Sequence, residues 1–487
     1  MRIGFDFVCD EAPLFSGIGK LFERDGCRVF GFTMGRRWDK WWHNQFSAYK
    51  LDAPNEARED IGGELERIQE QYGSHAPASF LTADRFLDKK PRDFQRSVLV
   101  STFEAVESAF EKEEPHYYIS TGVAFLYNLV TLAVCAQRDI PHISIYSTRA
   151  QKPRFTISLG NGGCWDLVDQ EYRLLQVTEQ YESFEYESGR AYLDSFRERP
   201  SNPFYMASAR QSHSIKSVFI KEFIGRMKYW YIDGWRKERG DYITQPPWWY
   251  AMRDMKKLVR ARSMAIKAGK IFDKPKDNSA YYLFPLHLQP EASTLVLSEW
   301  YVDQLQTIRN ISKTLPLDTV LYVKEHMSAF GRHSIEFYNA IKAIHNVSLI
   351  GPGASTPKLI KESLGVIVLS STVGWEAALL NRQVFVLGQV FYRSLIGVES
   401  IGSFDDLRTK LLAYRRDEGR SSPKNNDDNI IKFLIALQRQ SFDGVFDVAK
   451  MDMRNVVTAD ENIEKLHAGL KGFIDRISSP EKHTVCS

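Results

Sequence analysis

The segment that most constrains the fold is an apolar run that passes directly into hydroxyl residues and then into a helix-forming stretch. Residues 366–369 are all aliphatic, Ser370, Ser371 and Thr372 follow, and a helix is expected from about Gly374. A strand that is apolar at every position is buried on both faces, which is typical of parallel sheets covered by helices. This segment therefore predicts an α/β fold.

The same alternation of strands and helices occurs in both halves of the chain. Strands are predicted at 2–8, 27–33, 116–120 and 141–146, and again at 281–286, 319–323, 347–350, 365–369 and 383–387. A chain of 487 residues is too long for one ordinary core. We therefore predict two α/β domains, at 1–277 and 278–404, followed by a helical tail at 405–487.

Two segments of the first half are expected to be irregular. Ser16–Gly19 is predicted to form a turn before a short helix at 20–25, and its two glycines lack the third glycine of a dinucleotide fingerprint. The polar stretch 147–169 is predicted to be a loop that follows a strand end, where open α/β sheets place their ligands. Within it, Arg149 and Arg154 are candidates for acceptor binding, and Asp166 is a catalytic candidate.

Cysteine usage and hydropathy favour a cytoplasmic protein. The five cysteines are scattered and form no CxxC pair or Cys/His cluster, which argues against a disulfide framework or a zinc site. The first residues resemble a strand rather than a signal peptide, and no window has the roughly 18 apolar residues of a membrane span. We expect a cytoplasmic protein, soluble or peripheral on the inner face of the cytoplasmic membrane.

Residues 206–277 differ in character from the rest of the first half. They hold 17 Lys/Arg against 7 Asp/Glu, interleaved with tryptophan and tyrosine. A solvated helical insertion explains this composition, and so does a track for an acidic glycan or for anionic lipid headgroups. Nucleic acid is not expected as a partner, because no known binding module accompanies the charge.

The strand end at 366–369 is suited to a nucleotide. The free N–H groups and positive dipole at the start of a helix bind anions, and Ser370, Ser371, Thr372 and Gly374 supply hydroxyls and close backbone approach. Glu376 is not explained as a capping-box partner, because Val373 stands where that motif needs Ser or Thr. Its carboxylate is predicted to accept hydrogen bonds from ribose hydroxyls.

Two further strand ends carry polar residues. Lys324, Glu325 and His326 follow the strand at 319–323, and imidazole there can stabilise a leaving phosphate. After the strand at 281–286 come three more candidates. His287 and Glu291 are candidates for catalysis and Gln289 for donor binding. Glu291 is interpreted as nucleophile or base, with capping of the next turn as the alternative.

These segments, in this order, resemble the bacterial capsule polysaccharide biosynthesis proteins, which include Kdo (keto-deoxy-octulosonic acid) transferases of capsule and lipopolysaccharide assembly. The resemblance covers about 281–398. Its motifs are Gln289–Ser293, Lys324–His326, Ser371–Leu379 and the Phe391-Tyr392 pair. The chain departs from the family at Met327, where proline is common, and it lacks an acidic pair beside Glu291 that some members have.

The resemblance implies a GT-B-like glycosyltransferase, with two Rossmann-like domains facing a cleft and C-terminal helices. The first domain would be the acceptor side, and residues 278–404 would bind the nucleotide sugar. The implied donor is CMP-Kdo, transferred with retention and without metal or other cofactor, and the acceptor is a surface polysaccharide or lipid-linked glycan. The alternatives are a CDP-polyol phosphotransferase, another nucleotide-sugar transferase of this fold, and a non-catalytic glycan-binding scaffold.

Overall fold

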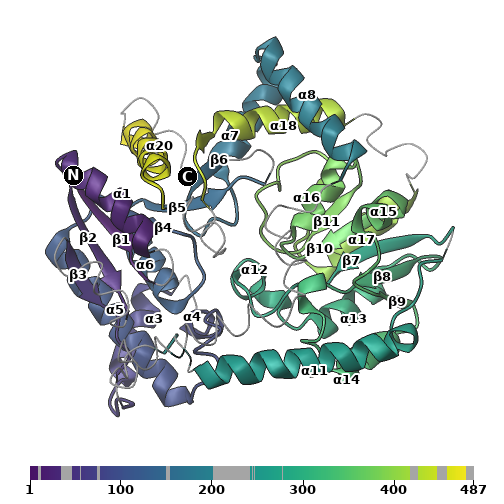
Figure 1. Cartoon of the computed structure of the whole chain (residues 1–487), viewed down its shortest axis with the longest axis horizontal. Helices are drawn as coiled ribbons and strands as arrows, with labels where there is room; N and C mark the ends of the chain where they lie inside the picture. The colour runs from purple at the N-terminus through teal and green to yellow at the C-terminus, as the bar shows by residue number, and fades with distance from the viewer. Residues whose placement is uncertain are drawn as a thin grey trace. The chain divides into compact units, whose positions relative to one another are not determined.

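The computed structural model describes residues 1–8, 12–34, 46–54, 56–73, 77–149, 154–200, 227, 242–243, 245, 247–276, 278–416, 426–446 and 458–478 (Figure 1). The chain divides into two compact units. The first comprises Met1–Val168, Ile224–Thr244 and Ala436–Ser487, and the second comprises Asp169–Phe223 and Gln245–Ile435.

The first unit contains a seven-stranded sheet of order β13-β6-β5-β4-β1-β2-β3. Strands β1 to β5 are parallel, whereas β6 is antiparallel to β5 and β13 is antiparallel to β6. The strands are β1 (Arg2–Asp6), β2 (Arg28–Thr33), β3 (Ser47–Lys50), β4 (Tyr117–Ser120), β5 (His142–Ser147), β6 (Arg154–Leu159) and β13 (Ser441–Asp443).

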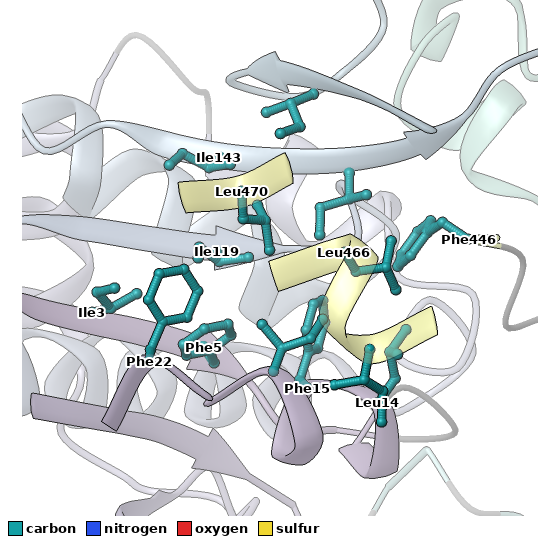
Figure 2. Close-up of a cluster of buried hydrophobic side chains, with 14 of the residues drawn as sticks. Ile3, Phe5, Leu14, Phe15, Phe22, Ile119, Ile143, Phe446, Leu466 and Leu470 are labelled. Atoms are coloured by element: carbon teal, nitrogen blue, oxygen red, sulfur yellow. The ribbon is translucent and has the colours of Figure 1, made fainter. Parts of the chain in front are cut away.

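Two helices that are far apart in the sequence pack together on this sheet. Leu466 and Leu470 of the C-terminal helix lie against Phe15 and Phe22 and the sheet residues beneath them (Figure 2). The helices of the unit are α1 (Ala12–Arg24), α3 (Gly62–Gln71), α4 (Pro77–Thr82), α5 (Arg92–Glu113), α6 (Leu126–Gln137) and α20 (Asp460–Ser478), and α7 (Asp166–Thr178) spans the boundary with the second unit.

The predicted turn at Ser16–Gly19 is wrong, because helix α1 already begins at Ala12. Leu14, Phe15, Ile18 and Phe22 are buried and lie on one face of this helix, and that spacing outweighs the two glycines. Gly17 is explained by helix packing, since a Cβ at this position would lie 2.5 Å from Ile463 Cδ1 on α20. This segment is therefore not a phosphate-binding turn.

The second unit contains a six-stranded, wholly parallel sheet of order β12-β11-β10-β7-β8-β9. The chain starts at β7, proceeds to β8 and β9 on one side, and then crosses back to β10 on the other. The strands are β7 (Tyr281–Pro285), β8 (Val320–Lys324), β9 (Val347–Ile350), β10 (Gly365–Val368), β11 (Val384–Val386) and β12 (Val398–Ser400).

Helices follow most strands of this sheet along the chain and pack against it. They are α8 (Ser183–Glu198), α11 (Pro247–Ile271), α12 (Ala292–Leu295), α13 (Gln304–Thr314), α14 (Ile335–Lys342), α15 (Thr356–Glu362), α16 (Thr372–Leu379) and α17 (Phe404–Arg416), with short 3-10 helices η3 (Glu299–Tyr301) and η4 (Met327–Ala329). Helix α18 (Asp427–Arg439) spans the boundary with the first unit. Within the described ranges, no helix is long and apolar enough to cross a membrane.

The α/β class and the two sheet domains are confirmed, but the chain is divided differently from the predicted boundaries. Residues 169–200 and 247–277 group with the second unit, although they were assigned to the first domain. The predicted tail is shared, because α17 packs on the second sheet while β13 and α20 join the first. The facing of two domains across a cleft stays a prediction.

Candidate functional site

Three of the predicted segments meet at the centre of the second sheet. They follow β7, β8 and β10, which are neighbours in the sheet and whose carboxyl ends lie at one edge. The chain reverses its direction of progress between β7 and β10, and open parallel sheets bind ligands at such a switch point. Ser370 Oγ donates a hydrogen bond to Ser293 O and so joins the segment that follows β10 to the segment that follows β7.

The three polar residues at the end of β8, Lys324, Glu325 and His326, lie in different environments. Glu325 is fully buried, where it accepts a hydrogen bond from the Tyr338 hydroxyl of α14 and, at 2.6 Å, one from the His326 backbone N–H. Burial raises the pKa of its carboxyl to about 7. The direct donor contact predicted for Glu325 does not fit this arrangement, because both of its carboxylate oxygens already accept hydrogen bonds within the protein.

His326 is arranged as a neutral hydrogen-bond donor. Its Nδ1 accepts a hydrogen bond of 3.2 Å from the Ser328 backbone N–H, so the neutral ring carries its proton on Nε2. Burial lowers its pKa to about 4, and the charges of Lys324 and Arg332 act in the same direction. At neutral pH His326 can therefore donate a hydrogen bond from Nε2 without bearing a charge.

Lys324 and Glu376 interact across the same edge of the sheet. Lys324 is only 7% exposed, and burial lowers its pKa while the charges of Glu325 and Glu376 raise it. Burial raises the pKa of Glu376 to about 7, and Lys324 opposes that rise. Within the described part of the chain, the Glu376 carboxylate makes no hydrogen bond or direct ion pair, so it is available to accept hydrogen bonds from a ligand.

Helix α16 begins beside this pair. Ser371 is its N-cap, and the hydroxyl accepts a hydrogen bond of 3.1 Å from the Val373 N–H. Thr372 is the first helical residue. The start of the helix thus presents a positive dipole end, although the Ser371 hydroxyl oxygen is already engaged in capping.

Gly374 has a packing role that the sequence did not reveal. The Tyr392 hydroxyl donates a hydrogen bond of 2.6 Å to Ser371 O and lies over the start of α16. A Cβ at position 374 would lie 2.2 Å from this hydroxyl oxygen. The Phe391-Tyr392 pair and Gly374 are therefore two parts of one packing arrangement that holds the start of α16.

We expect Gly374→Ala to destabilise the protein by about 1–3 kcal/mol, because the added methyl group displaces Tyr392. Tyr392→Phe removes the atom nearest the new methyl group, so the double variant should be more stable than the two separate losses predict. Thermal unfolding of the four proteins in a double-mutant cycle measures this coupling. Strictly additive losses would contradict the contact.

The loop after β7 places its candidates unequally. His287 is buried, both its backbone groups are bonded to the Gln304 amide, and burial lowers its pKa to about 3. Its Nε2 is buried and has no hydrogen-bond partner among the residues that the structure describes. Gln289 donates a hydrogen bond of 2.7 Å to Val302 O. His287 is thus neutral at physiological pH, and Gln289 is held by the protein itself.

Glu291 occupies the N-cap position of α12, but its side chain makes no capping hydrogen bond. Capping of the next turn, which was the alternative to a catalytic role, is therefore not observed. Burial lowers the pKa of Arg332, and the charge of Glu291 acts in the opposite direction. The charge of Arg332 in turn helps to lower the pKa of His326. Arg332 was missed in the sequence, where the only signal is a basic residue after Gly331, six positions beyond His326.

The remaining predicted residues belong to the first unit. Arg154 is the first residue of β6 and is bonded to Asp443, Ser441 and the Gln438 carbonyl, so its guanidinium is committed to the pairing with β13. This corrects its assignment to a free acceptor-binding loop. The alternation of Phe155, Ile157 and Leu159 is the strand signal that was overlooked. Arg149 is exposed after β5, and Asp166 is exposed at the start of α7.

Comparison with known protein families places this site in a matched segment. Residues 235–418 match the family model described as capsule polysaccharide biosynthesis protein. The segment includes all three strand ends, so the resemblance inferred from the sequence is confirmed there. No curated protein sequence matches the chain.

Solved structures give more distant likenesses. The Thermosulfurimonas dismutans KpsC, beta Kdo 2,7 transferase, is 10% identical, with 76% of this chain and 89% of that chain covered at a TM-score of 0.36. The UDP-GlcNAc 2-epimerase from Neisseria meningitidis is 12% identical, with 90% and 99% covered at a TM-score of 0.25. At these TM-scores neither likeness supports a conclusion about activity.

Proposed function

We propose, from the membership of residues 235–418 in the capsule polysaccharide biosynthesis family, that this protein is a glycosyltransferase of capsule assembly. The observation that carries the proposal is the cluster at the switch point of the second sheet. There a buried lysine, a neutral imidazole N–H and the start of α16 lie with a half-buried carboxylate that has no partner among the described residues.

This cluster suits the phosphate and ribose of a nucleotide. Lys324 and the Nε2–H of His326 would donate to phosphate oxygens, and the positive end of α16 would add to their effect. Glu376 would accept hydrogen bonds from the ribose hydroxyls. Arg332 adds a further positive charge near His326. These groups together meet the charge of one phosphate without a metal ion.

The proposed donor is CMP-Kdo, and the proposed acceptor is a capsule polysaccharide or lipid-linked glycan. A CMP-sugar has a single phosphate, which fits the few cationic groups of this site. In the transfer, the bond between the sugar carbon and the phosphate oxygen breaks, and its electron pair leaves with CMP. Lys324 and His326 would stabilise that charge as it develops, which is the interaction that accelerates such a step.

Glu291 is the proposed carboxylate on the sugar side of the reaction. As a nucleophile it would bond to the sugar carbon as CMP leaves, and the acceptor hydroxyl would then replace it, with retention. As a base it would take the proton of the attacking acceptor hydroxyl. His287 is buried and neutral, so we assign it to positioning the loop rather than to proton transfer.

A thermal-shift panel with CMP, CDP, UDP and GDP tests the donor site. CMP at about 100 times its dissociation constant should raise the melting temperature by roughly 2–4 °C. His326→Asn should reduce the shift, whereas His345→Asn, which changes an exposed histidine of the same unit, should not. A preference for UDP or GDP would reject the CMP-sugar donor, and no response to any nucleotide would reject a transferase.

A further inference from the structure

Helix α11 has two opposite apolar faces, and within the described ranges only one of them is covered. The covered face packs on the second unit: Met264 and Ile271 lie in its core, and Gly331 lies so near that a Cβ there would be 2.8 Å from Ala261 Cβ. The donor-site residues do not belong to this helix. The second apolar face has no role in the proposed transfer.

The second apolar face is a stripe at helical spacing, interrupted by one turn at Arg262 and Ser263. Successive residues lie three, four or seven positions apart, which places them on one side of an α-helix. Their exposed fractions are large for apolar side chains. The stripe consists of Trp248 (56% exposed), Met252 (49%), Met255 (56%), Val259 (60%) and Ile266 (87%).

Positive charge accompanies the stripe from the middle of the helix onward, because the basic residues of α11 begin at Arg253. Helix α11 carries seven basic residues and a single acidic one, Asp254. Lys256, Arg260 and Lys267 lie four and seven positions apart and are exposed, so they form a row beside the stripe; Arg260 also donates a hydrogen bond to the Arg332 carbonyl. Lys257, by contrast, faces the covered side, where burial lowers its pKa.

We infer that the stripe of α11 docks on an anionic lipid surface. An amphipathic helix of 25 residues, about 37 Å long, can lie in the plane of a bilayer with its apolar side chains below the headgroups. The row of lysine and arginine would then lie at the level of the phosphates. Tryptophan suits this position because its ring is amphipathic, and methionine suits it because its flexible side chain adapts to a fluid environment.

The charge of the helix favours lipid over a second copy of the chain. Two copies packed stripe against stripe would bring two rows of positive charge together with one acidic residue each to offset them. An anionic headgroup layer is complementary along the entire row. The acceptor of the proposed transfer does not enter this argument, so the docking surface stands independently of the donor site.

Co-sedimentation of the full-length protein with phosphatidylglycerol-containing vesicles tests the inference, with phosphatidylcholine vesicles as reference. Met252→Asp with Met255→Asp should lower the affinity at least tenfold, since two exposed apolar anchors are lost. Lys256→Gln with Lys267→Gln should lower it about 25-fold, at roughly fivefold for each charge. Binding of the native protein should also weaken at high salt.

Matched controls change the same residue types elsewhere on the second unit. Leu317→Asp alters an apolar side chain that is fully exposed, and Lys358→Gln with Lys313→Gln removes two exposed charges. Neither control should change vesicle binding. Equal binding by the stripe variants overturns the inference. Failure of the native protein to bind the vesicles also overturns it. In that case, a dimer that dissociates in the Met252→Asp, Met255→Asp variant would assign the stripe to a second copy of the chain.

Discussion

Lys324→Met is expected to lower sugar transfer about 100- to 1,000-fold, which is typical for the loss of one preorganised group at a developing oxyanion. The variant should remain folded, because the folded protein already disfavours the charged lysine: burial lowers its pKa. Methionine has a similar length and no charge to bury. Transfer of Kdo from CMP-Kdo to a glycan acceptor fraction measures the loss, and circular dichroism checks the fold.

The same variant should change the pH dependence of nucleotide binding. Lys324 lowers the pKa of Glu376, which burial has raised to about 7. In the native protein, binding that needs the Glu376 carboxylate is present above that pKa and is lost as the pH falls through about 7. Without Lys324 the pKa rises further, so the loss should begin at a higher pH.

Lys410→Met provides the matched control, because Lys410 pairs with Glu399 and Asp406 away from the donor site. It should alter neither transfer nor the pH midpoint of CMP binding. If Lys324→Met transfers sugar at a near-native rate, Lys324 is not a phosphate contact. If transfer is lost but the midpoint stays in place, Lys324 does not act on Glu376.

The buried parallel strands were the most predictable part of the fold. The strand Val347–Ile350 has the predicted bounds, and β7, β8, β10 and β11 begin and end within one residue of theirs, whereas β12 was not predicted. Such strands are recognised in the sequence as short aliphatic runs, because both of their faces are covered. The polar residues that follow them meet because carboxyl ends of parallel strands lie at one edge, so the grouping of the site followed from the same pattern.

What was missed depends on contacts that are distant in the sequence. The two glycines of α1 suggested a turn, whereas Gly17 is small because Ile463 of α20 packs against it. Strand β13 pairs with β6 across nearly 290 residues, and no local pattern indicates that partner. Glu325 could not be separated from Lys324 and His326 without knowing where α14 places Tyr338. Local periodicity predicts elements, whereas their partners require the packed structure.

Glu291→Gln is expected to lower sugar transfer about a thousandfold or more while CMP binding is kept. The amide has the shape of the carboxylate but can act neither as nucleophile nor as base, and losses of this size follow removal of a reacting group. The proposed phosphate contacts come from the end of β8, from His326 and from the start of α16, so they remain. Glu299→Gln, an exposed glutamate of the same segment, is the matched control and should transfer at the native rate.

A positioning role for Glu291 predicts a different outcome, because its charge also acts on Arg332. If Glu291 only holds Arg332, then Arg332→Gln should reproduce the loss, the double variant should be no worse than either single one, and CMP affinity should change in all three. If Glu291 reacts with the sugar or the acceptor, Arg332→Gln should retain measurable transfer that the second substitution abolishes. Near-native transfer by Glu291→Gln would exclude both roles, and the reacting carboxylate would then have to be sought outside the loop that follows β7.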